Sequence, residues 1–130
     1  MNRHQAREKA LQALFQIDMT KTSAEEAIEA VLEDKSPHSL LVELVNGVVQ
    51  QQEAIDEFIT KHLENWSLSR LARIDRNILR IAAYEMRFLD DIPVNVSIDE
   101  AIELAKTFGD DQSSRFVNGV LSKLKSGLEK

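Results

Sequence analysis

The stretch from Arg70 to Leu89 constrains the fold of this chain more than any other segment. At about 3.6 residues per turn, its apolar residues fill one side of a helical wheel, which is typical of a helix that buries one face. These residues are Ile74, Ile78, Leu79, Ile81, Ala82, Met86, Phe88 and Leu89. The opposite side carries Arg73, Arg76, Arg80 and Arg87 in one row. The sequence therefore predicts a central helix with an apolar face in the core and a guanidinium face outside it.

Two acidic residues break this pattern. Glu85 falls in the middle of the apolar arc, where an unpaired carboxylate would be costly. We therefore expect a cation to meet it. Asp75 also lies on the core-facing arc, and we expect it to be a buried partner for an arginine.

The composition favours helices almost throughout, because only four glycines and two prolines interrupt 130 residues. That length fits one domain covering residues 1–130. Cysteine is absent, which excludes disulfides and thiolate metal sites. The sequence has neither a secretory leader pattern nor an apolar run of about 18 residues, so we expect a cytoplasmic protein.

The charge is unevenly distributed along the chain. The net charge of -6 argues against a general affinity for nucleic acid, which requires local basic patches. The first nine residues, however, hold Arg3, Arg7 and Lys9 against Glu8 alone. We expect the first helix to project its first turns beyond the core and to expose Arg3 and Arg7 there. The alternative is that both are ordinary solvated or ion-paired terminal residues.

Helical periodicity predicts a first helix from about Arg3 to Met19. A second helix follows, because Ser23 and Glu26 have the spacing of a capping box, in which two side chains satisfy the free amides at a helix start.

The third helical region has less certain limits. Ser36 and Pro37 suit the N-cap and the first helical position. An apolar seam then continues to about Leu63, and its periodicity fits one long helix or two. We interpret Trp66, the only tryptophan, as a lid over the core rather than a platform for a ligand.

Two more helices follow the central one. Ser97 and Glu100 form a second capping-box pattern, and Gly109 offers a left-handed stop to the helix that they begin. Asp110 or Asp111 then caps the last helix.

Phe116 stands about 100 degrees away from the apolar stripe of the last helix, beside Gly119 and Lys123. An aromatic ring next to cations and a bare glycine is suited to stacking on an unpaired base. The alternative is that another helix packs over Gly119 and Phe116 fills the gap.

Catalytic motifs are lacking. The chain contains no glycine-rich phosphate loop and no nucleophile elbow. Its histidines, His4, His38 and His62, are dispersed without a set of carboxylates to complete a metal site. We therefore favour an all-helical binding module without cofactor or metal over an enzyme.

Three blocks of the sequence go beyond composition. They are RHQAREKALQALFQ at the start, IDRNILRIAAYEM in the centre, and PVNVSIDEAIELAKTFGDDQSSRFVNGVL near the end. Together they resemble the NusB family of bacterial transcription antitermination factors, in the same order and over nearly the whole chain. The last block is the most specific of the three.

The resemblance implies an all-α fold of about seven helices in two bundles. It also implies a non-enzymatic role: binding the single-stranded boxA element of ribosomal RNA leader transcripts jointly with the ribosomal protein NusE, in an assembly that recruits the RNA polymerase elongation complex. The residues that it implies for RNA binding are Arg3, His4, Gln5, Arg7, Phe15, Arg115, Phe116 and Asn118. Those that it implies for the protein partner are Arg76, Tyr84 and Glu85, and a cation of the partner would then complete Glu85.

One departure and two alternatives accompany this interpretation. Family members often have a denser arginine run where this chain has His4 and Gln5, which predicts low RNA affinity for the isolated protein. The first alternative is a NusB-like RNA-binding module that assists ribosomal RNA modification or maturation, which would have to act on a separate enzyme. The second is a helical scaffold that associates with itself through the arginine row or the acidic middle of the chain.

Overall fold

The computed structural model describes residues 1–128, and within them it contains seven α-helices, one short 3-10 helix and no strand. The elements are α1 (Arg3–Thr20), α2 (Ala24–Leu32), α3 (Ser39–Gln50), α4 (Gln52–Thr60), η1 (Leu68–Arg70), α5 (Arg73–Phe88), α6 (Val94–Phe108) and α7 (Asp111–Leu128). None of these helices is long and apolar enough to cross a membrane.

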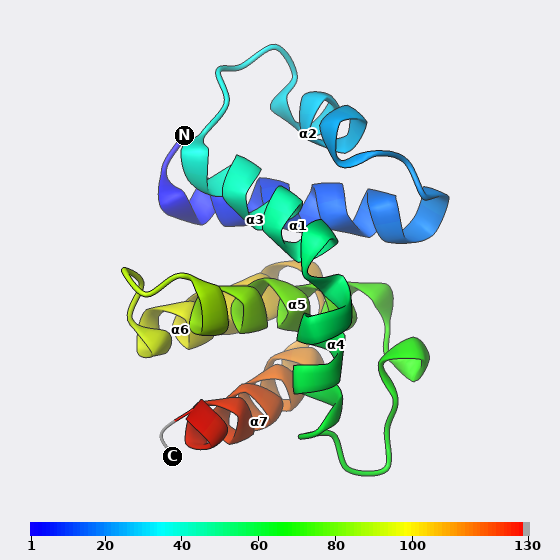
Figure 1. Ribbon diagram of the computed structural model, residues 1–130, viewed down its shortest axis with the longest axis vertical. Helices are drawn as coiled ribbons and strands as arrows, with labels where there is room; N and C mark the ends of the chain where they lie inside the picture. Colours follow the sequence, from blue (N-terminus) through cyan, green and yellow to red (C-terminus); the bar gives the residue numbers. More distant parts are fainter. Residues whose placement is uncertain (129–130) are drawn as a thin grey trace.

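The helices form two bundles that meet at α5. Figure 1 shows α1, α2 and α3 at one end of the long axis and α4, α6 and α7 toward the other, with α5 between them. Helix α5 contacts α1 and α3 on one side and α4, α6 and α7 on the other. The expected all-α fold of seven helices in two bundles is confirmed.

Because α5 is surrounded, it is buried over more of its circumference than its amphipathic pattern indicates. Every residue from Asn77 to Met86 is buried, including Arg80, which is only 7% exposed. The expected exterior row of arginines is therefore wrong at Arg76 and Arg80, while Arg73 and Arg87 are exposed.

The two inner arginines are held by acidic residues of neighbouring helices. The Nε and NH2 groups of Arg76 lie 2.9 and 2.8 Å from Oδ2 of Asp18 on α1. Arg80 donates from Nε and NH2 to the two carboxylate oxygens of Asp56 on α4, at 2.8 and 3.0 Å. These pairs fasten α1 and α4 to α5. Because their charges are paired in this way, the arginine side of α5 can lie between the two bundles.

Several helix ends agree with the sequence. The Ser23 side chain accepts a hydrogen bond from the Glu26 amide and caps α2, and the Asp110 carboxylate accepts one from the Ser113 amide at the start of α7. The region after Pro37 forms two helices rather than one, because the helix is interrupted at Gln51.

Other predicted ends are wrong. Helix α3 begins at Ser39 with His38 as its cap, so Ser36 and Pro37 precede it. Helix α6 begins at Val94, directly after Pro93, and Ser97 is therefore inside the helix, where its hydroxyl donates to Glu85.

Gly109 follows α6 without adopting a left-handed conformation, since its φ is -116°. A side chain at this position would collide with Ser113 and with the Ala105 carbonyl. A glycine is needed here because the turn between α6 and α7 leaves no room for a side chain, and not because of its backbone angles.

Candidate nucleic-acid interface

The first turn of α1 presents one exposed cation, Arg3, and one exposed amide, Gln5. Arg3 is exposed and forms no ion pair with any residue from 1 to 128. Gln5 is also exposed, and its side chain closes a capping box with Asn2. The exposure of Arg3 is as expected from the sequence, although Ala6 of the same turn is already buried in the core.

Arg7, only one turn further on, lies in the interior. It is 1% exposed, and its Nε and NH2 groups donate to the two carboxylate oxygens of Glu85 at 2.8 and 2.9 Å. Ser97 donates to the same carboxylate at 2.8 Å, and Glu100 lies 3.4 Å from Arg7 NH1. The predicted exposure of Arg7 is wrong, because the cation that Glu85 requires comes from the chain's own first helix and not from a partner.

His4 lies at the edge of this buried cluster. Its Nδ1 is 2.8 Å from a carboxylate oxygen of Glu100, and its Nε2 is 3.7 Å from Glu8. The hydrogen bond to Glu100 raises the pKa of His4 above its ordinary value of 6.5. His4 therefore carries more positive charge near neutral pH than a solvated histidine does.

The residues expected to meet a protein partner are also engaged inside the chain. Tyr84 is 6% exposed, packs over Gly47 and donates its hydroxyl to Glu43 at 2.7 Å. Burial and this carboxylate raise the pKa of Tyr84 to about 12. Glu85 is paired with Arg7, and Arg76 with Asp18. The idea that a partner's cation completes Glu85 is therefore wrong.

The first half of α7 forms a second surface. Arg115, Asn118 and Gly119 are exposed, and Phe116 is half-buried. Apart from its chain neighbours and the backbone of α7, no atom of residues 1–128 lies within 4 Å of the position that a Gly119 side chain would occupy, so no other helix of this part packs there. The alternative in which a bundle helix covers Gly119 is wrong, and Phe116 stands beside open space.

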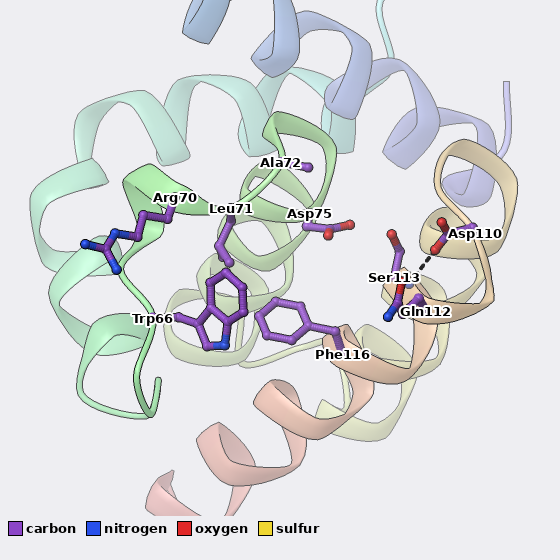
Figure 2. A pocket seen from close by; sticks show the side chains of 9 residues that line it. All are labelled: Trp66, Arg70, Leu71, Ala72, Asp75, Asp110, Gln112, Ser113 and Phe116. Carbon is purple, nitrogen blue, oxygen red and sulfur yellow. Dashed lines mark hydrogen bonds between the residues drawn. The ribbon is translucent and has the colours of Figure 1, made fainter.

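Trp66 joins Phe116 on this surface, which sequence reasoning missed. It is 54% exposed and therefore is not a lid over the core. Figure 2 shows the Trp66 and Phe116 rings next to each other, and both line a cavity of about 420 Å³. The cavity is lined by Trp66, Arg70, Leu71, Ala72, Asp75, Asp110, Gln112, Ser113 and Phe116. The neighbouring polar residues Glu64, Asn65 and Ser67 were the available signal that Trp66 belongs to a loop.

A second hollow, of about 480 Å³, lies against the outer flank of α1. It is lined by Met1, Gln5, Glu8, Lys9, Gln12, Lys35 and Phe108. Phe108 ends α6 and is two residues from Asp110, which lines the cavity beside Phe116. Phe15 is half-buried and lies about one turn beyond Gln12. The turn between α6 and α7 therefore connects the two predicted RNA-facing elements.

Residues 1–128 contain no group of three or more histidine and acidic side chains that could hold an ion. What the surface does offer is exposed guanidinium, amide and aromatic groups, which suit recognition of a flexible polyanion with flat bases.

Comparisons with known proteins identify relatives of this chain. The sequence model of the NusB family matches residues 4–126. A transcription antitermination protein NusB of Bacillus subtilis is 57% identical over 99% of this chain and 98% of its own length, and one of Bacillus licheniformis is 59% identical over 99% and 100%.

Solved structures of similar fold also come from the NusB family. T. maritima NusB superimposes with a TM-score of 0.89 at 36% identity, covering 100% of this chain and 99% of its own. The NusB chain in a crystal structure of the antitermination factors NusB and NusE with double-stranded RNA gives a TM-score of 0.84 at 31% identity, covering 98% and 99%.

Proposed function

This chain belongs to the NusB family, and from that membership together with its surface we propose that it is a transcription antitermination factor. It binds the single-stranded boxA element of ribosomal RNA leader transcripts jointly with the ribosomal protein NusE. The complex then joins the RNA polymerase elongation complex, and the protein acts in the cytoplasm. No covalent chemistry is part of this role.

The strongest support from this chain's own structure is the exposed Trp66 ring next to the half-buried Phe116 ring, beside exposed cations. Stacking on such rings requires bases that are not already paired, so the surface suits a single strand. The proposed RNA contacts are the accessible members of the predicted set, namely Arg3, His4, Gln5, Phe15, Arg115, Phe116 and Asn118.

The buried residues take a different part in this proposal. Arg7 positions the first turn of α1 through its pair with Glu85, and does not touch RNA. Arg76 and Tyr84 likewise fix α5 within the fold rather than meeting NusE with their charged or polar groups.

The affinity of the isolated protein should be low and sensitive to salt. The cations accessible along the surface include Arg3, Lys9, Arg115 and Lys123, and we propose that three or four cations engage phosphates. For a single strand this gives a slope of log K against log salt of about -2 to -3. NusE would raise the affinity by adding its own contacts to the same strand.

A titration with a short boxA-type RNA tests the proposal. RNA labelled with a fluorophore is titrated with the protein at two salt concentrations, with and without NusE, and a duplex of the same sequence is the control. We expect weak binding of the single strand, the stated salt slope, and tighter binding with NusE. Equal affinity for the duplex, or no binding in the presence of NusE, would contradict the proposal.

A further inference from the structure

The cavity beside Trp66 and Phe116 is lined by an acidic side chain, Asp75, that the fold satisfies only in part. Trp66 comes from the loop before η1, Phe116 from α7, and the cavity floor from the start of α5. Its volume of about 420 Å³ lies within the range of about 300–1,000 Å³ that small-molecule sites occupy. The two rings lie next to each other and give the cavity apolar surface, and Asp75 lies deeper, at its floor (Figure 2).

Asp75 is the anomaly at this floor. Among the buried side-chain polar atoms of residues 1–128, its Oδ1 alone has no hydrogen-bond partner. The sequence predicted an arginine partner, and the structure supplies none. An unsatisfied buried acceptor destabilises a fold, so each one in a native structure calls for an explanation.

The surroundings relieve this cost only in part. Burial raises the pKa of the Asp75 carboxyl and the nearby Asp110 raises it further, while the Ser113 hydroxyl acts in the opposite direction. Asp110 itself is satisfied, because it accepts from the Ser113 amide at 2.8 Å. Arg70 is exposed at the rim of the cavity and is paired with no acidic side chain of the described residues.

We infer that this cavity is a base-specific subsite, in which one unpaired nucleobase of the RNA stacks on the Trp66 and Phe116 rings and donates a hydrogen bond from its Watson–Crick edge to Asp75. Arg70 at the rim then meets the adjoining phosphate. The inference rests on the proposed RNA-binding function and assigns to it a recognition element.

The floor also determines which bases fit. A carboxylate accepts hydrogen bonds and rejects neighbouring acceptors. Guanine offers adjacent imino and amino donors on its Watson–Crick edge, and adenine and cytosine each offer an amino group. Uracil offers one imino donor between two carbonyl oxygens, which the carboxylate repels. The subsite therefore favours guanine and disfavours uracil.

Trp66 is itself the probe for occupancy, because it is the only tryptophan of the chain. The protein is titrated with a short oligouridine and with the same strand carrying one central guanosine, and tryptophan emission and binding are recorded together. We expect the guanosine strand to bind about fivefold or more tightly and to quench the emission strongly.

Two variants with matched controls locate the effect. Trp66→Ala should weaken binding of the guanosine strand about fivefold or more, whereas Val96→Ala, at another exposed apolar residue, should not. Asp75→Asn should abolish the preference for guanosine over uridine, because an amide both donates and accepts. Asp99→Asn removes the same charge from an exposed position of α6 and should leave the preference intact.

The outcomes distinguish a failure of the base-specific subsite from a failure of the proposed RNA-binding function. Binding of both strands with equal affinity and unchanged emission would overturn the subsite while leaving RNA binding in place. Quenching by NusE alone, without RNA, would assign the cavity to the protein partner and equally overturn it. No binding of any strand, even with NusE, would remove the proposed function itself.

Discussion

The buried pair of Arg7 and Glu85 gives the sharpest prediction about the fold. Both side chains are at most 2% exposed, and two hydrogen bonds of 2.8 and 2.9 Å join them. Arg7→Ala leaves a carboxylate in the core whose only remaining donor among residues 1–128 is the Ser97 hydroxyl. Removing one partner of such a pair costs about 3–5 kcal/mol.

That cost translates into a large change of thermal midpoint. With an unfolding entropy of about 2.1 cal/mol/K per residue, a chain of this length loses ~3.7 °C per kcal/mol. We expect the Tm of Arg7→Ala to fall by about 11–18 °C in a calorimetric or circular dichroism melt. Arg3→Ala, on the exposed first turn, is the matched control and should change Tm by about 2 °C or less.

A second variant tests the cause. In the double variant Arg7→Met with Glu85→Met, both charges are gone and the apolar side chains fill the space, so most of the lost stability should return. If Arg7→Ala melts within about 4 °C of the unchanged protein, or if the double variant is no more stable than the single one, the ion pair is not what holds α1 to α5 and the reasoning is refuted.

Three further predictions follow from individual contacts. Gly47→Ala should lower Tm by about 4–11 °C, because the added methyl group overlaps the Tyr84 ring, and a Tm within about 2 °C of the unchanged protein would show that the ring moves aside freely. His4 should titrate in an NMR experiment with a pKa above 6.5; since the folded value is raised, its contribution to stability is present below about pH 6.5 and lost as pH rises through the folded pKa. Burial acts to raise the pKa of Asp18, but hydrogen bonds from Asn77 and Arg76 lower it, so its contribution is present above about pH 3.8 and lost as pH falls through the folded pKa. Asp18→Asn should therefore flatten the acid limb of a stability curve, and an unchanged limb would contradict the assignment.

Much of the fold could be predicted from the sequence, because helix periodicity and caps are local properties. The span of α1, the Ser23 and Asp110 caps and the apolar face of α5 depend on residues within a few turns of one another. The arrangement in two bundles came instead from the resemblance to a family, since periodicity does not say which helix packs on which.

The errors share a physical reason. Arg7 looked like a surface cation because its partner Glu85 is 78 residues away, and the same distance hid the cation that Glu85 requires. Ser97 fits a capping pattern, but Pro93 starts α6 one turn earlier and the hydroxyl serves Glu85. Each of these assignments depends on tertiary contacts that a single sequence does not display.

Only part of the candidate site could be predicted from the sequence, for a similar reason. Phe116 could be singled out because a helix has a periodicity from which a ring can depart. Trp66 lies in a loop, where no such reference exists, and Asp75 was assigned a partner that the fold does not bring to it. The cavity exists only because the loop before η1 meets α7, and no local pattern encodes that meeting.

The most direct measurement of the central claim is an NMR map of the protein with a single-stranded boxA-type RNA. We predict that amide shifts concentrate at residues 3–5 and 115–119 and around Trp66, with α2 and the outer face of α3 unaffected. Shifts concentrated on α2 and α3, or spread evenly without any change at Phe116, would contradict the claim that these two helix starts form the RNA-binding surface.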